Sequence, residues 1–141
     1  MAYKIYFDIN VLLDLTLQRK NYSEIEMIIQ QVENGSMNGF VCGATIHTLS
    51  YFLSKYYGIE KTKQILLSLL SFISIIDATK EDIQKALFTN IKDIEDAIQI
   101  QTALSFKMDY FLSYDKQLIK ASSEALQIVN PKEFLKMWAA N

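Results

Sequence analysis

Short, uniformly apolar runs alternate along the chain with longer stretches in which apolar residues recur every three or four positions. The first run covers residues 3–7, and Val11, Leu12 and Leu15 then follow at roughly helical spacing. The runs are rich in the β-branched and aromatic residues that favour strands. We therefore predict strands at residues 3–7, 40–42, 73–76, 110–112 and 127–129.

Helices are predicted between these strands, because residues that cap helix ends flank the periodic stretches. Ser23 with Glu26 has the spacing of a capping box. Asp93 is placed to cap a later helix, and Asn130 followed by Pro131 starts the last one. The pattern along the whole chain is an alternation of strand and helix.

Such an alternation indicates parallel strands joined by right-handed crossover connections, with helices on both faces of the sheet. At 141 residues the chain has the length of one domain and can bury a core. Half of the residues are apolar and there are only four glycines and one proline, which is typical of an ordered globular protein. The predicted fold is α/β: a single three-layer α/β/α sandwich over residues 1–141.

The location of the protein is constrained by its apolar segments and its cysteine content. The most apolar stretch, residues 65–76, contains three serines and is shorter than the ~20 residues of a membrane-spanning helix, so we expect a core segment. Asp8 and Asp14 interrupt the N-terminal apolar run, unlike a secretory signal. Cys42 is the only cysteine, which excludes an internal disulfide and a cysteine-based zinc site. We expect a cytoplasmic protein with no membrane partner.

The charge balance limits how the chain can contact nucleic acid. A formal net charge of -2 argues against a broadly basic protein that coats nucleic acid through many phosphate contacts. Local contacts remain open, with Arg19 beside Lys20 and a group of lysines at residues 55–63 as candidates. For each group we favour the structural explanation, that these are solvated helix ends.

Four aspartates are predicted to lie at one edge of the sheet. Asp8 ends the first strand, Asp115 stands in a turn just past the strand at residues 110–112, and Asp93 and Asp96 open the helix that leads into that strand. Ligands of open parallel sheets bind at the carboxyl ends of the strands. Carboxylates that share a cleft repel one another unless a cation bridges them, and Mg²⁺ prefers such oxygen ligands. A divalent metal there would suit phosphodiester hydrolysis.

Two of these aspartates have a structural alternative. Asp93 and Asp96 both lie in a helix start, where a carboxylate complements the helix dipole, and for Asp93 we favour that explanation. Asp8 is harder to explain structurally, because a charged residue that ends a buried strand needs a partner or an ion.

Three segments that carry these residues resemble motifs of the PIN-domain family, which includes the VapC-type ribonuclease toxins of bacterial toxin-antitoxin pairs. Residues 7–14 resemble the first motif, with Asn10 two residues after Asp8 and Ile9 in place of the usual Thr or Ser. Residues 92–98 resemble the acidic helix start of the family, and residues 110–115 its closing strand motif. Together with the terminal strand-to-helix step at residues 129–135, the resemblance covers nearly the whole chain.

This resemblance implies a metal-dependent ribonuclease that cleaves single-stranded RNA with Mg²⁺ or Mn²⁺. It also implies an antitoxin partner, a homodimer and a sheet order of 3-2-1-4-5. Carried onto this sequence, Asp8, Asp96 and Asp115 would hold the metal, with Asp93 as a secondary ligand. Asn10 and Ser113 would position ligands or water.

One departure from the family pattern concerns its second acid, which normally precedes a core leucine in the third helix. Here Thr48 precedes Leu49, so that carboxylate is missing. A shift of one residue would bring His47 to the position, although Ser50 on the same side of the helix favours a solvent-facing histidine.

Two other functions therefore remain open. A binding module for nucleic acid or protein on the same fold, without catalysis, would explain both the missing acid and the acidic composition. A structural or oligomerisation protein would use the aromatic cluster of Tyr51, Phe52, Tyr56 and Tyr57 as an interface, although core packing explains part of that cluster.

Overall fold

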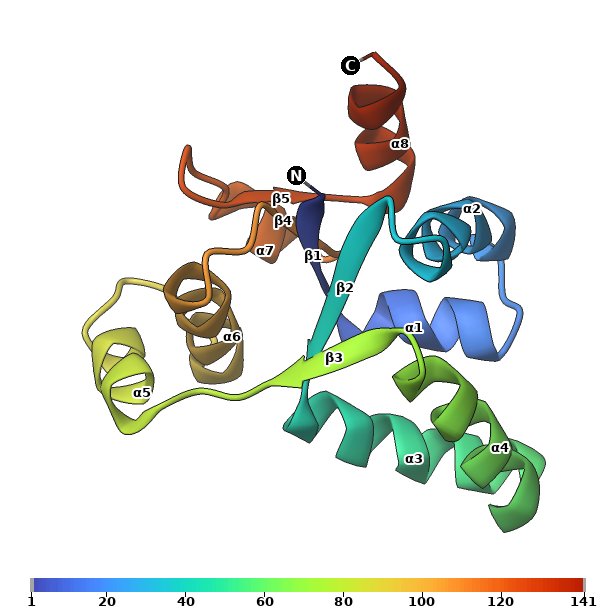
Figure 1. Cartoon of the computed structure of the whole chain (residues 1–141). Helices are drawn as coiled ribbons and strands as arrows, with labels where there is room; N and C mark the ends of the chain where they lie inside the picture. The colour runs from blue at the N-terminus through green and yellow to red at the C-terminus, as the bar shows by residue number, and fades with distance from the viewer. Residues whose placement is uncertain (1, 141) are drawn as a thin grey trace.

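A computed structural model describes residues 2–140, in which a five-stranded parallel sheet is enclosed by helices (Figure 1). The five predicted strands are present, and all have the predicted bounds except the second, which begins three residues earlier, at Met37. In chain order the elements are β1 (Tyr3–Phe7), α1 (Ile9–Thr16), α2 (Tyr22–Glu33), β2 (Met37–Cys42), α3 (Gly43–Tyr57), α4 (Ile59–Leu70), β3 (Ile73–Ile76), α5 (Lys80–Leu87), α6 (Ile94–Ser105), β4 (Tyr110–Leu112), α7 (Lys116–Lys120), β5 (Gln127–Val129) and α8 (Pro131–Ala139).

The strand order is β3-β2-β1-β4-β5, as the family resemblance implies, and every neighbouring pair is parallel. Strand β1 is central, with Ile5 aligned between Gly39 of β2 and Tyr110 of β4. The chain builds the sheet outward from β1 through β2 to β3, and then crosses back to add β4 and β5 on the other side. The topological switch point therefore lies between the carboxyl ends of β1 and β4.

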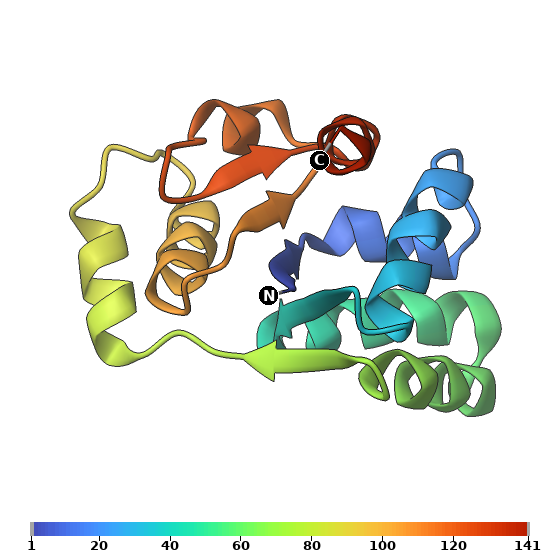
Figure 2. The same cartoon turned by 45° about the horizontal axis from the view of Figure 1, so that its top comes forward.

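Each face of the sheet packs against its own helical layer, which confirms the predicted three-layer α/β/α sandwich (Figures 1 and 2). Alternate residues of β1 point to opposite faces. Ile5 and Phe7 lie in the larger core with α1, α2, α3, α4 and α8, whereas Tyr6 lies in the smaller core with α6 and α7. Both faces are covered, which is why the strands read as continuous apolar runs.

Two of the predicted helix starts form as expected, and one does not. The side chains of Asp93 and Asn130 cap α6 and α8. The capping box predicted at Ser23 and Glu26 is wrong, because α2 begins at Tyr22 and Ser23 lies inside it. The residue before the helix is Asn21, whose side-chain amide donates a hydrogen bond to Asp14 instead of capping the helix.

The apolar stretch at residues 65–76 is only partly a core segment. Leu69 and Ile73 are buried, but Leu67 is 71% exposed and Ile75 is 46% exposed. The reason is topological: β3 is an edge strand, and α4 covers the sheet with one face only. Within residues 2–140, no helix has both the length and the apolar character needed to span a membrane.

Candidate functional site

The predicted aspartates gather at the switch point between β1 and β4. Asp8 directly follows β1, and its backbone N–H donates to the carbonyl of Leu112 at the end of β4, with an N···O distance of 3.0 Å. Asp115 lies three residues beyond Leu112, and Asp96 lies in the first turn of α6. The order of the strands thus brings residues more than 100 positions apart to one edge of the sheet.

Asp8 is a buried carboxylate held by two donors. Its Oδ1 accepts from the backbone N–H of Ile9 at 2.8 Å, as the cap of α1, and its Oδ2 accepts from the Ser113 hydroxyl at 2.7 Å. Burial raises the pKa of Asp8, and the negative charge of Asp115 raises it further, although the two hydrogen bonds work in the opposite direction. Asp8 therefore has a fixed orientation and pays an electrostatic penalty for its charge.

Ser113 links the ends of the two strands. Its side chain is fully buried, and its hydroxyl donates to Asp8 while accepting from the backbone N–H of Asp115 at 3.0 Å. One hydroxyl therefore sets the orientation of the Asp8 carboxylate and the path of the chain at Asp115. The predicted positioning residue thus does contact two of the predicted acids.

Asp96 has the most perturbed carboxylate of the group. Partial burial raises its pKa to about 6, with further contributions from the negative charges of Asp93, Asp115 and Asp8. Asp96 therefore lies within electrostatic reach of Asp93, Asp115, Asp8 and Glu95, and Asp8 lies within reach of Asp115. A cluster of this kind is typical of sites that bind a cation or work near neutral pH.

Asp93 and Asp115 are both exposed and both cap helices. Asp93 Oδ1 accepts from the backbone N–H of Asp96 at 3.0 Å, and Asp115 Oδ1 accepts from the backbone N–H of Gln117 at 2.8 Å. The capping role favoured for Asp93 is therefore present. A capping carboxylate keeps free lone pairs, so this role does not prevent it from taking a second partner.

Three of these acids line a cavity of about 550 Å³ between the start of α6 and α7. Asp93, Asp96 and Asp115 share its wall with two lysines, Lys92 and Lys120. Lys120 could not be selected from the sequence, because it lies on a short helix where only a turn was predicted. Acids and lysines together suit a phosphate ester, whose charge the lysines would neutralise while the acids hold a cation.

The donor set fits a hard divalent cation that keeps part of its water shell. Carboxylate oxygens are the ligands that Mg²⁺ and Mn²⁺ prefer, and Mg²⁺ commonly uses one or two of them together with water and substrate phosphate. Across residues 2–140, no three His, Cys, Asp or Glu side chains lie close enough together to hold a metal ion by themselves. A site of this kind would be completed by water and by the substrate.

The remaining predicted residues lie in exposed positions. Asn10 is exposed in the first turn of α1, two residues after Asp8. Thr48 and His47 are exposed on α3, which confirms the expected solvent-facing histidine. The Thr48 hydroxyl donates to the carbonyl of Ala44 at 3.3 Å, within its own helix. Among residues 2–140, no hydrogen bond links the Thr48 side chain to the predicted acids.

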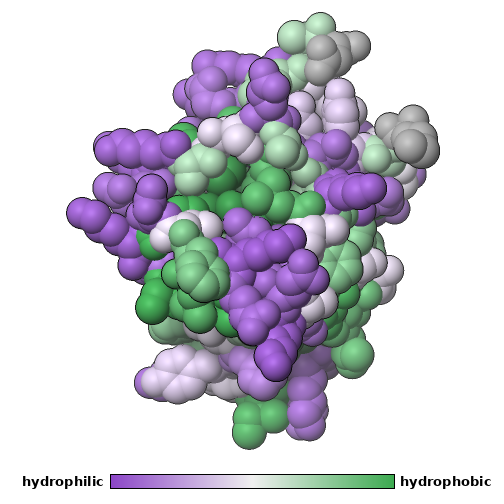
Figure 3. Space-filling model, turned by 90° about the vertical axis from the view of Figure 1, so that its left-hand side faces the viewer, coloured by the Kyte–Doolittle hydropathy of each residue, from purple (hydrophilic) through white to green (hydrophobic). Residues whose placement is uncertain are grey.

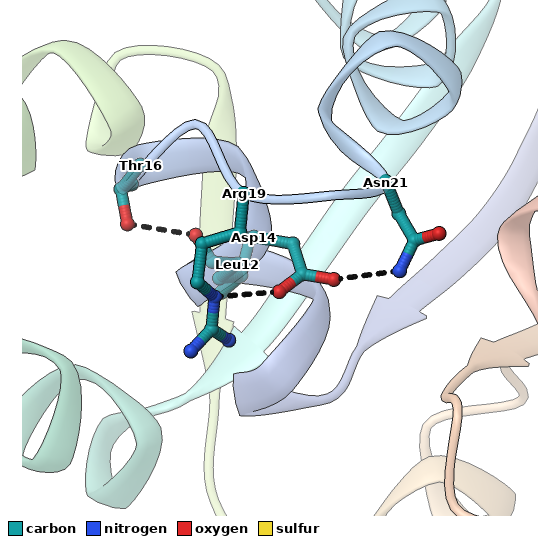
Figure 4. A network of polar contacts seen from close by, with 5 residues as sticks. All are labelled: Leu12, Asp14, Thr16, Arg19 and Asn21. Atoms are coloured by element: carbon teal, nitrogen blue, oxygen red, sulfur yellow. Dashed lines mark hydrogen bonds and ion pairs between the residues drawn. The ribbon is translucent and has the colours of Figure 1, made fainter.

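A further buried aspartate, Asp14, belongs to a structural network rather than to the acidic cluster (Figure 4). Its Oδ1 accepts from Nε of Arg19 at 2.7 Å, and its Oδ2 accepts from the amide of Asn21 at 3.0 Å. These contacts fix the turn between α1 and α2. Arg19, considered from the sequence as a nucleic-acid contact, is thus engaged by Asp14 through one of its three nitrogens.

The perturbed pKa of Asp96 predicts a pH dependence of stability in metal-free protein. In the unfolded chain this carboxyl has its ordinary pKa of 3.8, whereas in the fold its pKa is about 6. The folded state therefore binds the proton more tightly, and the stabilisation is complete below pH 4 and lost as the pH rises through 6. After allowance for solvent screening, we expect the free energy of unfolding of the wild type to fall by about 1 kcal/mol as the pH rises through this range. Asp96→Asn should not show this fall.

Urea unfolding at pH 4.5 and pH 7, in the presence of a chelator, measures this difference. If the difference in unfolding free energy between wild type and Asp96→Asn is the same at both pH values, the raised pKa of Asp96 is contradicted.

Comparisons with known proteins agree with the observed fold. A family model described as a PIN domain matches residues 4–117. The structure is similar to VapC20 of Mycobacterium tuberculosis, a sarcin-ricin loop cleaving toxin, with a TM-score of 0.63 at 10% identity over 85% of this chain and 97% of that one. It is also similar to PAE2754 from Pyrobaculum aerophilum, with a TM-score of 0.66 at 14% identity over 100% of this chain and 92% of that one. No curated protein sequence matches the chain.

Proposed function

Because this chain belongs to the PIN-domain family, we propose that it is a metal-dependent ribonuclease that cleaves single-stranded RNA internally. The observation that carries the proposal is the meeting of Asp8, Asp96 and Asp115 at the switch point of the sheet. At least two of them, Asp8 and Asp96, have raised pKa values that a bound cation would reverse.

Each residue has a separate role in the proposed reaction. Asp8, Asp96 and Asp115 would hold Mg²⁺ or Mn²⁺ together with water that remains on the ion, Asp93 would be a secondary ligand, and Asn10 would position substrate or water. The metal supplies polarisation of the scissile phosphate and a lower pKa for the attacking water. Ser113 keeps Asp8 in a single orientation through its hydrogen bond. No protein side chain needs to attack the phosphorus.

The two lysines of the cavity explain how a protein of net charge -2 can bind RNA. Lys92 and Lys120 place positive charge next to the acids, where phosphates on either side of the cleaved bond would lie. Each neutralised phosphate releases counterions, so binding should weaken as the salt concentration rises. RNA contact is then confined to one face of the molecule.

The cellular role that we propose is that of a toxin with an antitoxin partner, acting as a homodimer in the cytoplasm. Support comes from the similarity to VapC20, which is itself a toxin that cleaves RNA of the sarcin-ricin loop. At 10% identity this similarity concerns the fold, so the RNA target and the antitoxin of this chain stay open.

Stabilisation by metal tests the proposed site without requiring a substrate. A ligand that binds only the folded state stabilises it by mass action, by ~2.7 kcal/mol at a hundredfold excess over its dissociation constant. For a chain of this size we expect millimolar Mn²⁺ to raise the melting temperature by about 5 °C. Asp8→Asn combined with Asp96→Asn should abolish the shift.

The matched control is Glu60→Gln, which removes an exposed carboxylate at the start of α4, away from the switch point. It should respond to Mn²⁺ as the wild type does. A melting temperature that Mn²⁺ leaves unchanged in the wild type would argue against the metal site, as would an equal shift in the double variant.

A binding module without catalysis is the second candidate, favoured by Thr48 at the position of the family's second acid. In that case the protein would retain RNA or protein binding through the same cavity but show no cleavage that depends on Asp8. RNA binding measured together with cleavage on one preparation separates the two functions.

A further inference from the structure

A second cavity lies on the other side of α6 from the acidic cleft, and its volume is about 440 Å³. Its walls are mostly apolar and come from the residues that follow β2 and β3 and from one side of α6. Ile94 and Ile98 of α6 contribute much of the apolar lining. On the face where α5 and α6 lie, shown in Figure 3, hydrophobic surface is interspersed with hydrophilic side chains, and Ile94 is 59% exposed.

One polar side chain, Gln99, faces this cavity from a buried position. It is only 8% exposed, and its Oε1 accepts a hydrogen bond from the Tyr6 hydroxyl at 3.1 Å. Among residues 2–140 the Gln99 Nε2 group donates no hydrogen bond, so both of its protons are available to a ligand.

Two carboxylate side chains also lie in the wall of this cavity. Asp77 and Glu95 both contribute to the cavity wall and both are exposed. Oδ1 of Asp77 accepts from the backbone N–H of Gly43 at 2.9 Å, which fixes the side chain at the start of α3 and leaves its other oxygen free. The cavity therefore offers a buried donor and more exposed acceptors.

The cavity lies close to the proposed catalytic acids, because residues of α6 and residues in and just after β1 contribute to both. Asp96 faces the acidic cleft from the first turn of α6, and the adjacent Glu95 faces the second cavity. Tyr6 lies in β1 two residues before Asp8, which follows the strand with a backbone that is still extended, so both side chains point to the α6 face of the sheet. A nucleotide whose phosphate reached Asp8 could place its base on the other side of the α6 N-terminus.

We propose that this cavity binds the base of the nucleotide next to the cleaved phosphate and prefers guanine and uracil over adenine and cytosine. The proposal rests on the ribonuclease function proposed above and adds a sequence preference to it. The apolar walls contact the faces of the base, as in other ligand pockets where few polar groups set orientation.

The preference follows from the edge of the base that enters the cavity first, which is the edge farthest from the sugar. The group farthest from the sugar is a carbonyl oxygen in guanine and uracil and an amino group in adenine and cytosine. Nε2 of Gln99 can donate to the carbonyl, whereas an amino group would meet a second donor with no acceptor between them. Tyr6 maintains this discrimination, because its O–H holds Oε1 and so fixes which way the amide points.

Sequencing the ends produced from a random single-stranded RNA pool tests the preference. We expect wild type to favour guanine and uracil at one position beside the cut by about tenfold. Gln99→Met should remove the preference, because the replacement keeps the length of the side chain but has no donor. Tyr6→Phe should relax it while retaining the cavity, because the amide is then free to turn. Gln101→Met, the same change on a part of α6 outside the cavity, should leave it intact.

Binding of single nucleotides provides a readout that does not need cleavage. Nuclear magnetic resonance spectra of Asp8→Asn protein should shift at Ala44 and Ala78 on addition of guanosine or uridine monophosphate. Adenosine and cytidine monophosphates should have much weaker effects, and Gln99→Met in the same background should abolish the difference.

These two measurements separate failure of this proposal from failure of the ribonuclease function. Cleavage that depends on Asp8 but shows no base preference, together with no selective shifts, overturns the base pocket and leaves the nuclease standing. Selective shifts that depend on Gln99, in a protein that cleaves no RNA, support the pocket and overturn the nuclease.

Discussion

Asp8→Asn is expected to lower RNA cleavage at least about a hundredfold while leaving the fold intact. Loss of even an indirect contact to a metal site typically costs ~10- to 100-fold in affinity or activity, and Asp8 is proposed as a direct ligand. The asparagine Oδ1 can still accept from the N–H of Ile9. Because the substitution also removes a buried charge whose pKa is raised, the variant should be at least as stable as wild type at pH 7.

The comparison needs wild type and Asp8→Asn purified in parallel, assayed on single-stranded RNA with Mn²⁺, and melted in the same buffer. Glu60→Gln serves again as the matched loss of a carboxylate. Equal cleavage by wild type and Asp8→Asn would assign the activity to a contaminant or to another site. A strongly destabilised variant would show instead that the Asp8 contacts hold the fold together.

Thr48→Glu is expected to tighten Mn²⁺ binding ~10- to 100-fold, the range typical of groups that support a metal site. The family resemblance places Thr48 where the second acid is expected, and on that placement the wild-type site would have one negative charge fewer than the family pattern. We therefore expect low wild-type activity that prefers Mn²⁺ and rises in the variant. The native Thr48 side chain is exposed and donates only to its own helix, so its loss should not disturb the fold.

His47→Glu provides the control, because it adds the same charge one position earlier on the exposed part of α3. Calorimetric titration of Mn²⁺ and RNA cleavage should be measured on the same preparations. If Thr48→Glu folds but gains neither affinity nor activity, Thr48 does not occupy the acid position. If only His47→Glu gains Mn²⁺ affinity and activity, His47 rather than Thr48 occupies the acid position.

The strands and the acidic edge could be predicted from sequence because both depend on local patterns. A strand buried on two faces, such as β4, is a short apolar run whose ends are sharply defined by polar residues. Asp8 directly follows such a run and Asp115 stands in the turn just past another, which is why both could be selected. Once the alternation of strands and helices indicated a parallel sheet, the position of both residues at its carboxyl edge followed from topology.

What could not be predicted depends on contacts between distant segments. The short helix α7 has too few residues for a periodic pattern, so Lys120 could not be assigned to the cleft. The second cavity joins residues after β2 and β3 to one side of α6, and the Gln99 amide is oriented by Tyr6 from the central strand. The misplaced capping box has the same origin, because the partner of Asn21 is a buried carboxylate of another helix.

The hydrogen bond between Ser113 and Asp8 joins residues 105 positions apart, and it has a consequence for protein synthesis. Asp8 is synthesised near the beginning of translation, whereas Asp96, Ser113 and Asp115 belong to the last third of the chain and are synthesised later. The proposed nuclease site therefore cannot exist on a nascent chain until β4 has docked beside β1. On the proposed function, a nascent chain could therefore not cleave RNA before β4 has docked, and an antitoxin would have no assembled nuclease site to block until then.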